Sequence, residues 1–417
     1  MAQSLLIIGS VWPEPDSSAA GRRMLQLISL FQSHGWEIVF ATSASEGDYA
    51  ADLRARDIRC VQTAINSSEF DDFIIKLQPS AVLFDRFIVE EQFGWRVAEQ
   101  CPDTVRILDT EDLHCLRRAR RRAVQEGRPF DPRELLGDDT AKREVASILR
   151  CDISLIISDF EMTLLENLFG VEASLLFYLP FLLTSVEEGD REDWPGFEER
   201  RDFVTIGNFR HPPNWDAVQY LKQQVWPLVR RQLPQAELHI YGAYPSRKAR
   251  QLDCPGDGFY IEGRAGDAKG VVRSGRVTLA PLRFGAGLKG KLVESMRCGT
   301  PSVTTSIGAE GLSGRLPWSG AVADEPQRIA SSAVQLYTDR EAWARAQQRG
   351  IRIINERFDK EQFADEFTDR LGTIRQNLRP HRRNNFIGGI LLHHTTASTK
   401  YMSRWIEEKN RLGKEME

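Results

Sequence analysis

Short apolar runs that alternate with helical patterns constrain the fold of this 417-residue chain more than any other feature. Residues 5–8 form an apolar run, and a polar loop then leads into apolar positions 24, 27, 28 and 31, which is the spacing of an amphipathic helix. Further apolar runs predict strands at 37–41, 81–84, 105–108, 153–157, 203–206, 237–241, 277–280 and 302–304. Because parallel strands need crossover connections, this rhythm predicts parallel sheets of the α/β class.

Helix signals lie between and after these runs. Ser158 to Glu161 has the pattern of a capping box, and it predicts a helix that ends at Gly170. Other helices are predicted from about residue 214, over 290–297, and from 358 to about 371.

An acidic stretch interrupts the rhythm and divides the chain. Between residues 184 and 201 there are seven acidic residues and three arginines, together with two glycines and a proline, which is typical of a linker. We therefore predict one parallel-sheet domain over 1–183, the linker at 184–201, a second parallel-sheet domain over 202–358, and a C-terminal helix with a basic tail over 359–417.

The composition excludes several classes of protein. Hydrophobic residues make up 41% of the chain and charged residues 27%, as in globular proteins, and the net charge of −4 favours no nucleic-acid partner. The six cysteines form no Cys-x-x-Cys pair, so neither a zinc site nor a disulfide framework is indicated. The chain has no secretory leader pattern and no apolar run of about 18 residues, so we expect a cytoplasmic protein.

The most informative segment runs from Pro281 to Glu294. Three glycines follow a predicted strand and precede a predicted helix, whose N-terminal N–H groups favour an anion, and Lys289 and Lys291 add two positive charges. The segment is neither a Gly-x-Gly-x-x-Gly fingerprint at the first strand nor a Walker sequence, so a nucleotide pyrophosphate is favoured over NAD or ATP. Glycines needed only for packing and solvated lysines are the alternative explanation.

Several segments together resemble a known family, the GT-B glycosyltransferases of group 1 (family 4). The resemblance extends over roughly residues 1–375. It depends on the segments 281–294, 294–301, 304–312 and 207–217, and on the Pro-x-Pro-Asp loop before Gly21 with the run 30–39. It implies two Rossmann-like domains that face each other across a cleft, the first on the acceptor side and the second holding a nucleoside-diphosphate-sugar donor, with a helical C-terminal extension.

The resemblance also implies which residues hold the donor. Glu294 matches the glutamate expected on the donor ribose, whereas Ala286 stands where relatives carry a first glutamate near the donor sugar. Lys289 is the most natural partner of the diphosphate and the leading catalytic candidate. The complete set of donor-binding candidates is Gly21, Gly207, Arg210, Arg283, Gly285, Gly287, Lys289, Lys291 and Glu294. For Arg210, a surface arginine that only caps a helix is an equally weighted alternative.

Polar residues at the end of the predicted strand 105–108 supply catalytic candidates from the first domain. Three carboxylates and a histidine follow this strand, and we select Asp112 and His114, with Asp109 and Glu111 as neighbours of the same kind. The alternative is a structural histidine. Asp85 and Arg86, at the end of another strand, have the same status.

Two basic segments suggest partners. Residues 117–122 contain five arginines. They could bind an anionic lipid or membrane. The default expectation is instead an exposed helix face whose arginines pair with the acidic linker or with Glu134, Asp138 and Asp139. The chain from residue 376 onward carries eight Lys/Arg against four Glu. This tail either docks on the protein, contacts an anionic membrane surface or is simply solvated, and the last is the default.

The sequence thus predicts a hexosyl-type glycosyltransferase that moves a sugar from a nucleoside diphosphate to the hydroxyl of a saccharide or lipid-linked acceptor, as in polysaccharide biosynthesis. Retention of configuration is expected from the family. Cations replace a metal, so we expect no cofactor, no metal and no covalent protein nucleophile. A sugar-nucleotide epimerase or hydrolase, or a non-catalytic protein that binds sugar nucleotides or anionic lipids, are the alternatives.

Overall fold

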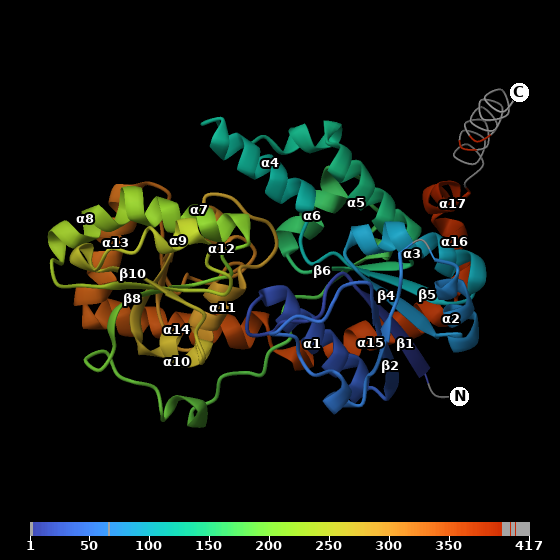
Figure 1. Ribbon diagram of the computed structural model, residues 1–417, viewed down its shortest axis with the longest axis horizontal. Coiled ribbons are helices and arrows are strands. Elements are labelled where there is room, and N and C mark those ends of the chain that lie inside the picture. Colours follow the sequence, from blue (N-terminus) through green and yellow to red (C-terminus); the bar gives the residue numbers. More distant parts are fainter. Residues whose placement is uncertain (1–2, 66, 394–400, 402–404, 406–417) are drawn as a thin grey trace, which may run out of the picture.

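The computed structural model describes residues 3–65, 67–393, 401 and 405, which form two α/β domains with one parallel sheet each (Figure 1). The first sheet has the strand order β3-β2-β1-β4-β5-β6-β7. Its strands are β1 (Gln3–Gly9), β2 (Trp36–Thr42), β3 (Arg59–Gln62), β4 (Ala81–Asp85), β5 (Val105–Asp109), β6 (Ile153–Ile156) and β7 (Leu176–Tyr178). The helices between them are α1 (Ala19–Ser33), α2 (Glu69–Leu77), α3 (Phe87–Gln100), α4 (His114–Gln125), α5 (Asp139–Arg150) and α6 (Asp159–Asn167).

The second sheet repeats this architecture in the order β10-β9-β8-β11-β12-β13. Its strands are β8 (Arg201–Ile206), β9 (Leu238–Tyr241), β10 (Phe259–Gly263), β11 (Gly275–Ala280), β12 (Ser302–Thr304) and β13 (Gly320–Val322). Its helices are α7 (Pro212–Tyr220), α8 (Trp226–Gln232), α9 (Arg247–Arg250), α10 (Ala268–Ser274), α11 (Gly290–Arg297), α12 (Ser306–Ala309), α13 (Pro326–Thr338) and α14 (Arg340–Arg357). Every pairing between these strands is parallel, as predicted.

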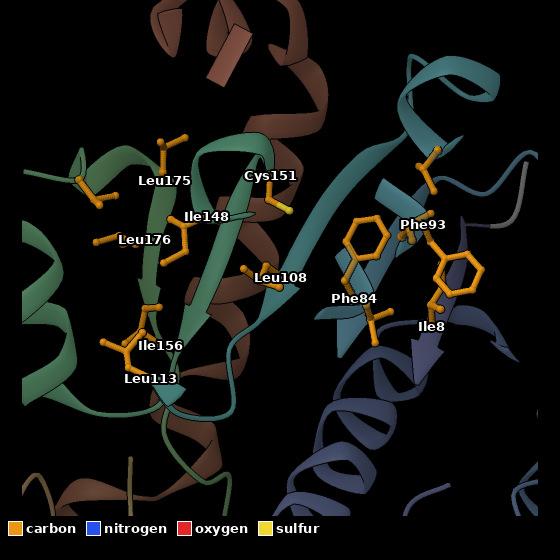
Figure 2. Packing of buried hydrophobic residues seen from close by; sticks show 14 of the residues in the cluster. Ile8, Phe84, Phe93, Leu108, Leu113, Ile148, Cys151, Ile156, Leu175 and Leu176 are labelled. Carbon is orange, nitrogen blue, oxygen red and sulfur yellow. The ribbon is translucent and has the colours of Figure 1, made fainter. Parts of the chain in front are cut away.

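Each sheet buries apolar side chains on both faces, which explains why the central strands were visible as continuous apolar runs. Figure 2 shows one cluster, in which Ile8, Phe84, Leu108 and Ile156 from four neighbouring strands pack with Phe93 of α3. The opposite face of the sheet packs against α1 and, from the far end of the chain, against α15 (Ala364–Gln376). In the second domain, α7, α8 and α13 cover one face, and α11 and α14 lie on the other.

The C-terminal part of the chain returns to the first domain. After α15 come α16 (Leu378–Asn384) and α17 (Phe386–Leu392), which lie at the end of the first domain that is remote from the second (Figure 1). The predicted helix after residue 358 is therefore present, although it begins later and extends beyond Leu371. Most of the predicted tail, residues 394–400, 402–404 and 406–417, lies outside the described residues. No helix of the described chain has the length and apolarity to cross a membrane.

The acidic segment 184–201 is tied to the second domain at both ends. Val186 exchanges hydrogen bonds with the Asn355 side chain, and the fully buried Arg200 donates to the Thr300 hydroxyl at 2.6 Å and to the Cys298 carbonyl at 2.9 Å. Arg200 also stacks on the Trp343 ring at 5.3 Å. The division of the chain at 183, 201 and 358 remains a prediction. The segment 184–201 is held against the second domain by these contacts.

A buried ion pair links the core of the first domain to its strand ends. Arg23 of α1 donates through Nε and Nη2 to the Asp109 carboxylate at 2.9 and 2.8 Å, and its Nη1 donates to the Leu179 carbonyl at 2.7 Å. Both side chains are fully enclosed. Asp109, a neighbour of the catalytic candidates in sequence, therefore has a structural role.

We expect Arg23→Met to destabilise the first domain by about 3–5 kcal/mol, because the Asp109 carboxylate stays buried without its counter-ion. Urea unfolding followed by tryptophan fluorescence measures the loss. Arg54→Gln is the matched control, since Arg54 pairs with Glu46 on the surface and the change should cost no more than about 1 kcal/mol. Equal effects of the two changes would contradict the buried pair's role.

Candidate active site

A cavity of about 840 Å³ lies between the two domains, at the carboxyl ends of both sheets. The first domain lines it with the loop after β1, the start of α1 and the residues between β5 and α4. The second domain lines it with the turns after β8, β9 and β10 and with the glycine-rich loop before α11. Ligands of open α/β sheets bind at this end of the strands, so the position agrees with the sequence prediction.

The structure brings most of the predicted site residues to this cavity. Residues that line it are Gly21, Gly207, Arg210, Gly285, Lys289, Lys291, Asp112 and His114. Three donor-binding candidates, Gly287, Arg283 and Glu294, do not line it. Gly287 belongs to the glycine-rich loop but lies on the side that contacts the first domain. The Arg283 and Glu294 side chains form ion pairs outside the cavity.

The Arg283 side chain belongs to the surface beside α7. It donates through Nε to the Asp216 carboxylate at 2.8 Å and lies over the Tyr220 ring at 4.9 Å. The prediction that Arg283 contacts the donor diphosphate therefore finds no support, because Asp216 already neutralises its charge outside the cavity.

Glu294 lies at the domain junction instead of in the main cavity. Its carboxylate accepts a hydrogen bond from Arg22 of α1, and both residues line a side cavity of about 30 Å³ that also borders on Gly290. The glutamate is buried. Arg22 therefore occupies Oε2, one of the two Glu294 oxygens that a ribose would use.

Two lysines place positive charge at the start of α11. Lys289 is buried and donates to the Gly287 carbonyl at 2.8 Å, while Glu310 lies 3.9 Å from its Nζ. Burial lowers the pKa of Lys289 to about 8 and the pKa of Lys291 to about 7. No carboxylate pairs with Lys291 among the described residues. The first turn of α11 also contains no acidic side chain, so its free N–H groups and the two lysines together give this end of the helix a positive potential.

Gly287 shows why the loop is glycine-rich. Its φ of +59° is in the left-handed region, and a Cβ at this position would lie 2.9 Å from the Asp112 Cβ. Only glycine allows the loop of the second domain to approach the first domain this closely.

Two first-domain side chains hold this loop in place. Glu161 of α6 accepts hydrogen bonds from the Leu113 N–H at 3.0 Å and from the Gly287 N–H at 2.9 Å. The predicted capping box is therefore wrong: α6 begins as expected, but Glu161 points to the neighbouring domain and Ser158 makes no side-chain cap. The helix ends at Asn167, before the predicted Gly170, which has the positive φ of a turn residue.

Arg120 of α4 provides the second support. It donates to both oxygens of Glu310, at 2.8 and 2.7 Å, and to the Gly285 carbonyl at 2.9 Å. The default expectation for the arginine run is therefore wrong for Arg120, and also for Arg117, which pairs with Asp112. It holds in part for Arg122, which lies 3.9 Å from Asp138. No sequence signal distinguished Arg120 from its neighbours.

Asp112, His114 and His211 form a polar group on the cavity wall. His114 Nε2 lies 3.5 Å from the Asp112 carboxylate, and burial lowers the pKa of His114 to about 4, although Asp112 opposes the shift. His211 lines the same part of the cavity and is exposed to solvent. Burial alone would raise the pKa of Asp112, but Arg117 and His114 outweigh it, so Asp112 is an anion beside the neutral imidazole of His114.

His211 is a site residue that the sequence analysis missed. It lies directly after Arg210 in the segment 207–217, so its position after a strand was a usable signal. Three other candidates, Asp85, Arg86 and Glu111, also line the cavity. Burial and the nearby Asp109 raise the pKa of Glu111 to about 8, so this carboxyl group holds a proton at neutral pH.

Contacts between the domains narrow the cavity at its other end. The Tyr244 hydroxyl donates to the Glu14 carboxylate at 3.0 Å, and Arg210 lies over the Tyr244 ring at 3.8 Å. Arg210 therefore lines the cavity while it contacts the Tyr244 ring, and among the described residues its side chain makes no hydrogen bond that caps a helix.

One group of the described residues has the geometry to hold a metal ion. Asp202, Glu237 and His239 offer ligand atoms that lie within 4.8 Å of one another. None of the three lines the cavity. The absence of a cofactor and of a metal from the reaction remains a prediction.

The comparisons with known proteins agree with this geometry. Residues 200–339 match the family model for Glycosyl transferases group 1. No curated protein matches the chain in sequence. Sucrose-phosphate synthase from Thermosynechococcus elongatus is similar in structure, with a TM-score of 0.63 and 15% identity over 90% of this chain and 99% of that one.

Two more solved structures show the same fold. HepE of Anabaena, in complex with UDP and glucose, aligns with a TM-score of 0.64 and 13% identity, covering 89% of this chain and 100% of its own. WaaG, a glycosyltransferase of lipopolysaccharide biosynthesis, aligns with a TM-score of 0.59 and 12% identity over 88% and 98% of the two chains. Both findings agree with the resemblance inferred from the sequence: this chain shares the two-domain GT-B fold of these structures, and residues 200–339 match the model of the group 1 family.

Proposed function

We propose that the protein transfers a sugar from a nucleoside diphosphate to an acceptor hydroxyl in the cavity between its two domains. The observation that carries the proposal is the pair of lysines at the start of α11, of which Lys289 is buried and Lys291 is half-buried on the cavity wall. No carboxylate pairs with Lys291 among the described residues, and both oxygens of Glu310, which lies near Lys289, already accept hydrogen bonds from Arg120, so a diphosphate would supply negative charge that the two lysines lack.

In this reaction the protein would mainly supply positive charge near the departing diphosphate and hold the two substrates in position. The bond between the sugar C1 and the diphosphate oxygen breaks, and the electron pair stays on the departing phosphate, where Lys289, Lys291 and the N–H groups of α11 stabilise it. The acceptor oxygen forms the new bond to C1. Its proton passes to the departing phosphate oxygen, which lies on the same face of the sugar when configuration is retained.

First-domain residues would position the acceptor. The neutral imidazole of His114 can accept a hydrogen bond from an acceptor hydroxyl, and the anionic Asp112 stabilises positive charge that develops nearby. Neither residue is assigned a covalent bond to the sugar.

The donor is best sought among uridine diphosphate sugars, because solved structures with this fold contain UDP or UDP-glucose. A hexose as the transferred sugar, an acceptor that is a saccharide or is linked to lipid, a role in polysaccharide synthesis and a cytoplasmic location all belong to this proposal.

We expect a UDP-sugar to raise the melting temperature of the protein in proportion to the logarithm of its concentration above Kd. A panel of UDP-, GDP-, ADP- and TDP-sugars, measured by thermal shift, identifies the donor base. Lys289→Ala should lower kcat about 10²- to 10³-fold with that donor, because it removes stabilisation of the leaving group. Arg283→Ala is the control and should retain activity. Turnover of Lys289→Ala at the rate of the unchanged protein would refute the assignment.

The acceptor separates transfer from the alternatives. Release of nucleoside diphosphate only when an acceptor is added indicates transfer, and release without one indicates hydrolysis. Binding without any turnover over a broad acceptor panel would indicate a protein that binds the sugar nucleotide only.

Donor affinity should fall as the pH rises through about 7 to 9. Lys291 and Lys289, with pKa values of about 7 and 8, lose their protons in this range, whereas the phosphodiester groups of the donor stay ionised. Isothermal titration at several pH values measures Kd. In Lys291→Arg the charge persists, so the decline should begin only above about pH 8, where Lys289 titrates. A Kd independent of pH would contradict the site.

The empty protein should gain stability from Lys291→Met. The folded pKa of Lys291 lies below its unfolded value, so the unfolded chain binds more protons between about pH 7 and 10 and the native protein becomes more stable as the pH rises. Removing the amine should raise the melting temperature at pH 7 by about 2–4 °C and flatten its rise with pH. A lower melting temperature would show that the lysine is already compensated in the empty protein.

A further inference from the structure

An apolar patch on α17 is remote from the proposed reaction. Phe386 is 72% exposed, the largest exposed fraction among the large apolar side chains of the described residues, and Ile387 and Ile390 are 53% and 52% exposed. Positions i, i+1 and i+4 lie on one side of a helix, so the three side chains form one outward stripe. None of them lines the cavity.

The helices that carry this patch are firmly attached to the first domain. Arg382 of α16 donates to both oxygens of the Asp152 carboxylate, at 2.7 and 2.8 Å, and the Asn385 side chain donates to the Leu149 carbonyl at 2.7 Å. Gly388 is buried against α5, where a Cβ would lie 2.0 Å from that same carbonyl. The opposite side of α17 is therefore packed, and the outward position of the apolar stripe is a fixed feature.

Positive charge surrounds the stripe. The 37 residues from Arg370 to Ile406 contain seven Lys/Arg and no Asp or Glu. Of these cations, Arg383 is exposed, and the Arg379 side chain is 84% exposed, with the equally exposed Asp103 only 3.9 Å away as its weak partner. Arg382 faces inward, and Arg370 donates to the Ser174 carbonyl.

We propose that α16 and α17 dock the protein on an anionic lipid surface. An apolar stripe that enters the acyl boundary, flanked by arginines at the level of the phosphate groups, is the combination by which interfacial helices bind membranes. A second copy of the chain fits the patch poorly. In a two-fold dimer through α17, the basic segment of one copy would lie against the basic segment of the other, and like charges repel. Three side chains also bury less area than a stable dimer needs.

The proposal goes beyond the transfer reaction and does not depend on it. One interpretation of the basic tail was contact with an anionic membrane surface. The proposal assigns this contact to residues that the structure describes. It also makes the first domain the part of the molecule that faces the lipid.

The test is cosedimentation of the full chain with vesicles of phosphatidylcholine alone or with about a third phosphatidylglycerol. We expect binding to the anionic vesicles and little to the neutral ones. Arg379→Gln with Arg383→Gln should weaken binding about 25-fold, at about five-fold for each arginine. Phe386→Ser, Ile387→Ser and Ile390→Ser together should weaken it at least about ten-fold, also at high salt, where the charge contribution is screened.

Matched surface variants provide the controls. Ile65→Ser, Ile75→Ser and Val322→Ser change side chains that are 42–45% exposed on other elements. Arg328→Gln with Arg345→Gln removes two exposed charges from the second domain. Both controls should bind like the unchanged protein, and a melting curve confirms that every variant is folded.

Several results would overturn the proposal. These are equal binding to neutral and anionic vesicles, no binding to either, or equal losses in the patch and control variants. A dimer in light scattering that the triple serine variant dissociates, without vesicle binding, would identify the patch as a contact between copies instead.

Discussion

The glycine-rich loop before α11 takes its position from the other domain, and the candidate site depends on this contact. Glu161 holds the Gly287 N–H and Arg120 holds the Gly285 carbonyl, so the first domain grips both polar groups of a short backbone segment. Because α11 begins three residues after Gly287, the same contacts set where Lys289 and Lys291 lie. The cavity is therefore a property of the domain pair, and an isolated second domain would lack the supports of its anion site.

Arg120, which supports the loop, also affects how far the charge of Lys289 is neutralised. Glu310 is the carboxylate closest to Lys289, but both its oxygens already accept hydrogen bonds from Arg120. The positive charge of Lys289 is consequently only partly neutralised, and its present hydrogen bond goes to the Gly287 carbonyl, a neutral group. An incoming phosphate would replace a weaker partner by a stronger one, since hydrogen bonds to charged groups are the stronger kind. Burial near Asp112 raises the pKa of Glu161 to about 7, so the loop's other support also responds to the charges around it.

The sequence predicted the central strands and the place of the glycine-rich segment between a strand and a helix because both have local signals. Strands buried on two faces appear as apolar runs, and a helix N-terminus after a strand is visible in glycines and lysines. The strands that the sequence analysis missed, β3, β7, β10 and β13, are the four edges of the two sheets. β3, β7 and β13 have only three or four residues, and β3, β10 and β13 are only partly buried, so their apolar signal is weak. Glu161 and Arg120 act over 126 and 165 positions of sequence, on backbone groups of the other domain. Such contacts exist only once the chain has folded, and for Glu161 the local pattern even favoured the wrong partner.

Ala286 fits this arrangement better than the glutamate that relatives are expected to carry there. It lines the cavity and also packs against the apolar cluster of the first domain that contains Leu113 and Leu116. The adjoining Gly287 lies against Asp112, the Glu111 backbone and Glu161. A further carboxylate at position 286 would enter a wall where burial and mutual repulsion already keep Glu111 protonated at neutral pH. The first domain thus supplies the acidic groups of this part of the cavity wall, and the charged side chains that the loop of the second domain adds to the cavity are lysines.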